Sequence, residues 1–181
     1  MKNVSAADDT IEKEWTEAIE RHRAVIADYL QTAARLDEQV WRLPVAAEKW
    51  TPAQITDHLI RTYEITLEQI RGGQGIKMQY GFPLRQILRL VLLPKIFRTR
   101  QLPRGAKAPQ EILPEDSKMP RQTTLEHLIK FSGEFENEIL SGRNNKNLRL
   151  THHVFGDIKP LKAIDFVAIH TEHHARQLPR R

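Results

Sequence analysis

The chain has 181 residues, with 28 Lys or Arg, 23 Asp or Glu and no cysteine, which excludes disulfides, thiolate metal ligands and a cysteine nucleophile. Its length is enough for one domain to bury a sizeable core, so residues 1–181 are expected to form a single domain. No apolar leader and no run of about eighteen apolar residues is present, and we therefore expect a soluble cytoplasmic protein.

Two amphipathic helices are predicted in the N-terminal part of the chain. The first covers about 5–41, where apolar side chains recur at every third or fourth position and both glycine and proline are absent. Thr51 is typical of an N-cap and Pro52 of a first helical residue, which predicts a second helix from there to about Arg71. His58 lies beside the apolar stripe of this second helix.

A long basic crossover is predicted over about 72–120, because this segment holds six of the ten prolines. Residues 69–110 contain nine Lys or Arg and no Asp or Glu, and an apolar run within them predicts a short helix over about 84–97. We expect this helix to pack its leucines on the rest of the protein and to extend its arginines into water.

Other partners of the crossover were weighed against that packing. Contact of residues 84–100 with an acidic membrane, or with a second subunit in a homodimer, is the alternative. Binding of nucleic acid is not favoured, because aromatic residues do not alternate with the basic ones.

Two further helices are predicted in the C-terminal third. The third long helix starts near Thr123 or Thr124 and stops in a polar turn over 141–147. An irregular segment over 148–159 follows, and the fourth long helix covers about 160–179. Four long helices with one crossover predict an all-α fold, a four-helix bundle.

Three histidines are candidate metal ligands. His170 and His174 lie four positions apart, so they share one helix face at the spacing of metal ligands. The pair alone is a weak signal in a chain with eight histidines, and a solvated helix face explains it equally well. His58, on a different helix, would complete a three-histidine set with open positions, although a structural hydrogen bond to a carbonyl is its alternative. Thr171 stands where zinc proteases of the His-Glu-x-x-His type need glutamate, so a protease is not favoured.

Three segments together carry a resemblance to a known family. Residues 50–59, the loop 152–156 and residues 170–178 resemble the DinB-like superfamily, in particular a branch with a His-x-x-Phe-Gly loop and a C-terminal His-x-x-His-His-x-x-Gln. The resemblance implies up-down-down-up order with the crossover between the second and third helices. It also implies that His58, His170 and His174 bind a divalent metal, with His173 outside the ligand set.

The resemblance also implies a chemistry. Characterised relatives include enzymes that transfer a low-molecular-weight thiol such as bacillithiol, mycothiol or glutathione. A metal-dependent enzyme is therefore expected, using Zn, Ni, Fe or Mn to activate such a thiol as cosubstrate and to transfer it to a small-molecule electrophile. A metal-dependent hydrolase and a non-catalytic binding module with a structural metal are the alternatives.

Four further residues were assigned to the surroundings of this site. Asp57, Glu172 and Asp157 could each orient a ligand ring by accepting its second N–H, and ordinary surface charge is the alternative for each. His152 is expected near the mouth of the site. The three tryptophans are predicted to be core or helix-junction anchors.

Overall fold

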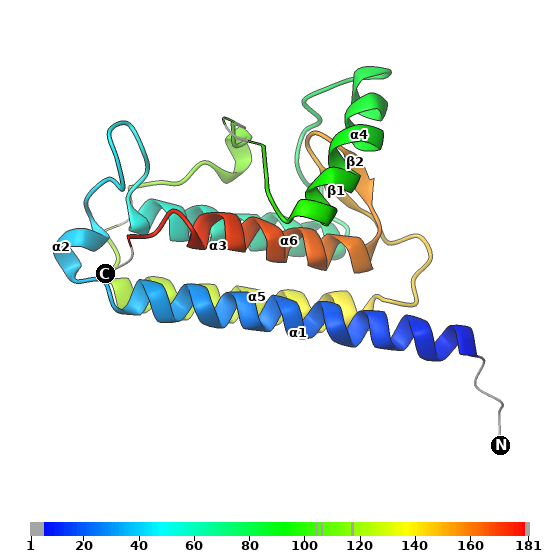
Figure 1. Cartoon of the computed structure of the whole chain (residues 1–181), viewed down its shortest axis with the longest axis horizontal. Helices are drawn as coiled ribbons and strands as arrows, with labels where there is room; N and C mark the ends of the chain where they lie inside the picture. The colour runs from blue at the N-terminus through cyan, green and yellow to red at the C-terminus, as the bar shows by residue number, and fades with distance from the viewer. Residues whose placement is uncertain (1–5, 104, 106, 117, 180–181) are drawn as a thin grey trace.

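The computed structural model describes residues 6–103, 105, 107–116 and 118–179, so Ser5, the predicted start of the first helix, lies outside the described residues. Four long helices form the body of the molecule: α1 (Ala6–Ala34), α3 (Pro52–Ile70), α5 (Arg121–Ser141) and α6 (Pro160–Ala175). The helices α1 and α6 run in one direction and α3 and α5 in the other (Figure 1). The all-α bundle and its up-down-down-up order are therefore confirmed.

The core lies between the four helices. The helix α1 packs mainly against α6, and α3 packs mainly against α5. The largest fully buried side chains come from all four long helices and from the short helix after α1, and they include Tyr29, Trp41, Tyr63, Leu128, Phe135, Ile164 and Ile169. Burial of such aromatic and branched side chains, each worth about 1.5–3 kcal/mol, aligns the helices that carry the histidines.

The start of α3 is fixed by the predicted cap. The hydroxyl of Thr51 accepts a hydrogen bond from the backbone N–H of Gln54 at 3.1 Å, and the Gln54 side chain accepts from the Thr51 N–H at 3.0 Å. Pro52 occupies the first turn, where its missing N–H costs nothing. The cap sets the register of α3 and so the direction of His58.

The first predicted helix is too long. The helix α1 ends at Ala34, and a separate short helix, α2 (Glu38–Trp41), follows. The side chain of Asp37 accepts a hydrogen bond from the backbone N–H of Val40 at 2.8 Å while its own backbone is extended, so Asp37 begins a new helix. A continuous apolar periodicity hides this break, because Leu36 and Val40 continue the apolar spacing of α1 beyond its end at Ala34.

Two smaller differences concern the C-terminal half. The helix α5 begins at Arg121, directly after Pro120, slightly before the predicted start. The segment predicted to be irregular contains an antiparallel hairpin of β1 (Leu150–His152) and β2 (Gly156–Ile158). Gly156 has φ of +72°, a conformation that favours glycine and lets the chain return after a short turn.

The crossover contains the helix α4 (Leu84–Thr99) and the 3₁₀ turn η1 (Gln110–Ile112). The helix α4 projects from the bundle beside the hairpin (Figure 1). Its inner face joins Phe155 and Phe166 in a second apolar cluster. The expectation that α4 packs its apolar side chains inward and extends its arginines into water is only half right. Ile87 and Leu90 are exposed, whereas Arg89 is half-buried and donates to the Phe155 carbonyl at 3.4 Å. The hairpin turn offers that acceptor, and it draws the arginine inward.

Candidate metal centre

Three histidine side chains meet between α3 and α6. The Nε2 atom of His170 lies 3.1 Å from Nε2 of His58 and 3.1 Å from Nε2 of His174. One ligand atom from each residue lies within 4.8 Å of the others, a group that could hold a metal ion. Among the residues that the structure describes, this group takes in no further histidine or carboxylate. The three nitrogens offer one face of a coordination sphere.

The other ring nitrogen of two of these histidines has a fixed partner. Nδ1 of His58 lies 2.7 Å from the carbonyl oxygen of Ile112 in η1. Nδ1 of His174 lies 2.8 Å from the side-chain oxygen of Gln177. Both partners only accept hydrogen bonds, so Nδ1 of each ring carries the proton. Such contacts orient metal-binding imidazoles and select their tautomer.

The tautomers leave lone pairs directed at one another. A neutral imidazole has a single N–H, and in His58 and His174 it is used at Nδ1. Their Nε2 atoms therefore present lone pairs to Nε2 of His170, which can donate to only one of them. A cation shared by the three nitrogens resolves this conflict, and neutral imidazole is a good ligand for divalent transition metals. The donor set fits such an ion.

The three imidazoles are held neutral. Burial lowers the pKa of His58 to about 4, against the opposing effects of the Ile112 carbonyl and Asp57. Burial, together with the other histidines of the cluster, lowers the pKa values of His170 and His174 well below the ordinary value. Because the charged form is disfavoured, the lone pairs remain available at neutral pH.

Trp50 and the exposure of His170 define the two sides of the cluster. The Trp50 ring centroid lies 4.9 Å from that of His58 and 6.3 Å from that of His174, so the half-buried indole covers these rings. His58 and His174 are buried, whereas His170 is half-buried. His170 is therefore the least buried residue of the cluster. The tryptophan is a wall of the site as well as the expected junction anchor.

The predicted carboxylates make their hydrogen bonds elsewhere. Glu172 accepts from Arg100 at the end of α4 and from Arg176, and so ties α6 to the crossover. Asp157 accepts from the hydroxyl of Thr151 across the hairpin. Guanidinium groups and hydroxyls compete for these oxygens, and neither carboxylate bonds to a ligand ring in the described part of the chain.

Asp57 acts one step away from the cluster. Its Oδ2 accepts from Arg61 and, at 2.8 Å, from the backbone N–H of Glu115. Glu115 lies three residues after Ile112, whose carbonyl orients His58. Asp57 therefore holds the crossover segment that carries this carbonyl. Among the described residues, its carboxylate makes no hydrogen bond to the imidazole of His58.

Two more histidines lie near the cluster. His152 stacks on Phe155 with ring centroids 4.8 Å apart and packs edge-on against Phe166. Burial lowers the pKa of His152 to about 3, and its Nδ1 accepts from the Val154 N–H. Nε2 of His173 lies 2.9 Å from the side-chain nitrogen of Gln177, so His173 turns toward the residue that orients His174.

Sequence reasoning missed three contributors: the Ile112 carbonyl, Gln177 and the Trp50 wall. Gln177 had a signal, because it follows His174 by three positions, a spacing that would place both on one face of the helix predicted over 160–179. Trp50 directly precedes the cap of α3, which also places it near His58. A backbone carbonyl from a crossover distant in sequence has no side-chain signature, so nothing in the sequence indicates Ile112.

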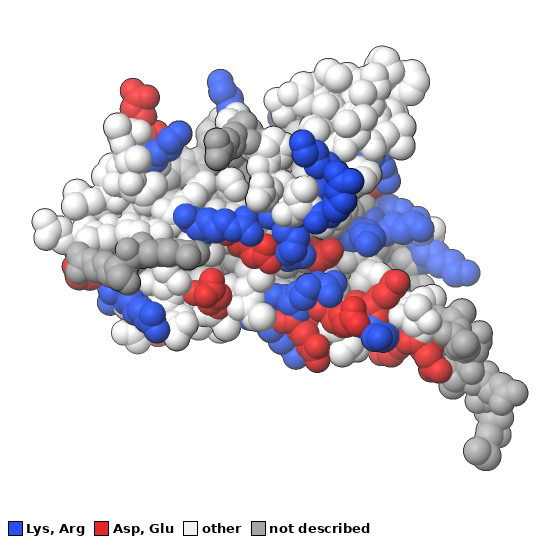
Figure 2. Space-filling view, viewed as in Figure 1, with Lys and Arg blue, Asp and Glu red and all other residues white. Residues whose placement is uncertain are grey.

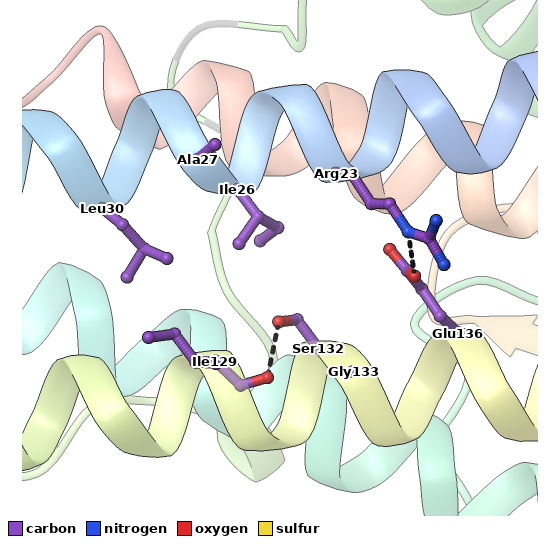
Figure 3. Close-up of a pocket in the computed structure, with 8 residues that line it drawn as sticks. All are labelled: Arg23, Ile26, Ala27, Leu30, Ile129, Ser132, Gly133 and Glu136. Atoms are coloured by element: carbon purple, nitrogen blue, oxygen red, sulfur yellow. Dashed lines mark hydrogen bonds and ion pairs between the residues drawn. The ribbon is translucent and has the colours of Figure 1, made fainter.

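A separate shallow pocket of about 230 Å³ lies between α1 and α5, and none of the three histidines lines it (Figure 3). Its lining residues are Arg23, Ile26, Ala27, Leu30, Ile129, Ser132, Gly133 and Glu136. Nε of Arg23 donates to Glu136 at 2.7 Å across one end. The pocket is apolar apart from this ion pair and the Ser132 hydroxyl, which donates to the Ile129 carbonyl.

A family model described as the DinB superfamily matches residues 18–178, which include α1 from residue 18 onward, the whole of α3, α5 and α6, and the three histidines of the cluster. No curated protein and no solved structure matches the chain.

Proposed function

The chain belongs to the DinB superfamily, and from this premise we propose that it is a metal-dependent enzyme whose divalent transition metal is held by His58, His170 and His174. We propose further that it transfers a low-molecular-weight thiol to small electrophiles. One observation carries the proposal: three neutral imidazoles direct Nε2 at one point, and two of them are locked in the required tautomer by acceptors at Nδ1.

The chemistry follows from the ligand set. A divalent ion on three imidazoles supplies Lewis acidity, which lowers the pKa of a thiol or water molecule that binds beside it. The ligand group contains three side chains in the described part of the chain, and it does not close with a fourth. A closed set of four is typical of structural zinc, whereas three ligands favour catalysis.

The surrounding residues suit a site that takes in small molecules. Ile112 and Gln177 hold the imidazoles of His58 and His174 in place, so these two rings lose little freedom when a ligand binds. Trp50 packs against His58 and His174, and His170 is the least buried of the three ligand residues. Because the chain has no cysteine, the thiol must come from a separate molecule.

The test is turnover by metal-free and reloaded protein. The metal is removed with a chelator, and the protein is reloaded with Zn, Ni, Fe(II) or Mn. The reloaded protein is mixed with bacillithiol, mycothiol or glutathione and with a chlorodinitrobenzene or bimane electrophile. The thiol conjugates are measured by mass spectrometry. We expect metal-dependent conjugation that is lost in His170→Ala. The variant His127→Ala, at a half-buried histidine on α5, should keep it.

The other outcomes decide against the transferase. Metal-dependent hydrolysis of a nitrophenyl ester with no thiol conjugation would favour a hydrolase. Metal binding without turnover of either kind would favour a binding module with a structural metal.

A further inference from the structure

The exposed apolar side chains are concentrated in one place. Of the nine large hydrophobic side chains that are exposed in the described part of the chain, six lie between residues 78 and 91. They are Met78 at 36 %, Phe82 at 80 %, Leu84 at 47 %, Ile87 at 55 %, Leu90 at 75 % and Val91 at 62 % exposed. Single exposed apolar residues are normal, but a contiguous group of this kind marks an interaction surface.

Four of these residues form one face of α4, and Met78 and Phe82 precede the helix. Leu84, Ile87 and Val91 recur at three and four positions, with Leu90 beside them, so they share a stripe along the helix. The other side of the helix is occupied, because Leu92, Leu93 and Ile96 belong to the cluster formed with Phe155 and Phe166. The exposed stripe is therefore not the packing face of α4, and the helix itself projects away from the bundle (Figure 1). We call Met78, Phe82, Leu84, Ile87, Leu90 and Val91 the apolar tip.

The charged residues interspersed in the apolar tip and next to it in the sequence are basic, and the nearby Glu111 carboxylate accepts from the backbone N–H of Lys77 at 3.2 Å. Residues 69–110 contain nine Lys or Arg and no Asp or Glu. Among them Lys77, Lys95 and Arg98 are exposed. Figure 2 shows the projecting end of the molecule as an uninterrupted uncharged surface with Lys and Arg side chains at its base. An apolar face bordered by basic residues is the pattern of helices that lie in the surface of an anionic bilayer.

We propose that the apolar tip docks the protein on a membrane surface that contains anionic lipids. The stripe would enter the acyl boundary while Lys77, Lys95 and Arg98 meet the headgroups. The contact is peripheral, since no helix in the described part of the chain has the length and apolar character needed to cross a bilayer. The proposal is independent of the metal centre.

A second copy of the chain is a poorer occupant of the same surface. A symmetric dimer would place the same patch of both subunits face to face. The basic border of each patch would then meet that of the other, with no acidic residue of 69–110 to offset the repulsion. Anionic lipid supplies the opposite charge.

The test is flotation of the full chain with two kinds of vesicle, phosphatidylcholine alone and equal parts of phosphatidylcholine and phosphatidylglycerol. We expect binding to the anionic vesicles at least about tenfold tighter than to the neutral ones, and weaker as salt is raised. Ile87→Glu should weaken that binding about tenfold. Ile11→Glu is the matched control, because Ile11 on α1 is 52 % exposed, close to the 55 % of Ile87, and it should bind as wild type does.

Circular dichroism melting shows whether each variant folds, and Leu90→Glu is a second probe at a 75 % exposed position. Absence of binding to anionic vesicles would overturn the proposal. So would an equal loss in Ile11→Glu and Ile87→Glu. A concentration-dependent dimer that Leu90→Glu dissociates, together with no vesicle binding, would assign the surface to a second copy instead.

Discussion

Gln177 is the residue on which the geometry of the C-terminal histidines depends most. Its side-chain oxygen accepts from Nδ1 of His174, and its side-chain nitrogen lies 2.9 Å from Nε2 of His173. Because that nitrogen donates to His173, the amide is held in the orientation that keeps the proton on Nδ1 of His174. His173 thus supports the ligand set through Gln177, without offering a ligand atom to it.

Replacement of Gln177 by alanine is expected to lower metal affinity about 10–100-fold, the usual effect of losing the partner of a ligand ring. Gln177→Glu should restore most of the affinity, because a carboxylate also accepts from Nδ1 of His174. Gln122→Ala, at an exposed glutamine on α5, is the control. Titration against a chelator of known affinity measures the effect. Equal affinities in Gln177→Ala and wild type would show that Gln177 has no such role.

The three clustered histidines were predictable for a physical reason. Helical periodicity sets which side chains share a face, so His170 and His174 could be paired and His58 placed beside a buried stripe. The carboxylates were less predictable, because an aspartate or glutamate bonds to whichever donor is nearest. For Glu172 that donor is Arg100, which is distant in sequence.

The crossover completes the site, although it lies outside the four bundle helices. Its turn η1 brings the Ile112 carbonyl to His58. Asp57 fixes the extended segment after η1 by accepting a hydrogen bond from the Glu115 N–H. The cap at Thr51 positions His58 itself, because it sets the register of α3. Sequence patterns predicted α3 and its cap, since both depend on residues close together in the chain. They could not predict where η1 packs, since that depends on contacts across the whole crossover.

Asp57→Ala is expected to weaken metal binding although Asp57 is not a ligand. Loss of its carboxylate frees the crossover segment after η1, so the Ile112 carbonyl that accepts from Nδ1 of His58 is less well held. We expect about a tenfold loss of affinity. Asp157→Ala, which removes a hairpin contact to Thr151, should leave the affinity unchanged. If both variants bind metal as tightly as wild type does, the crossover does not position His58.

At the scale of the whole molecule, a buried polar network joins the helices. Nδ1 of His22, on α1, lies 2.7 Å from a carboxylate oxygen of Glu136 on α5. Nε2 of the same ring lies 2.7 Å from the hydroxyl of Tyr63 on α3. Arg23 donates to the same carboxylate. Burial acts to raise the pKa of Glu136, but the hydrogen bonds from His22 and Arg23 outweigh burial and hold that pKa below its ordinary value. The ionised carboxylate therefore stabilises the bundle.

This network predicts a pH-dependent stability. Because the pKa of Glu136 is lower in the folded state than in the unfolded state, where it is about 4.3, its contribution is present above that pH. The contribution is lost as the pH falls through the folded-state pKa. Glu136→Gln should lower the free energy of unfolding by about 1–3 kcal/mol near neutral pH. The difference from wild type should shrink in acid.

Urea unfolding across the pH range, followed by circular dichroism, measures this difference. Glu126→Gln, at an exposed glutamate on the same helix, is the control and should stay close to wild type at every pH. A constant difference between Glu136→Gln and wild type down to acid pH would contradict the role given to the ionised Glu136.

The metal content of the three-histidine cluster is the property on which the proposed function depends above all. Inductively coupled plasma mass spectrometry of protein purified without an affinity tag tests this directly. We predict about one divalent transition metal ion per chain in wild type and in His127→Ala, and its loss in His58→Ala and in His170→Ala. Full retention of metal in both His58→Ala and His170→Ala would contradict the assignment of this cluster as the metal centre.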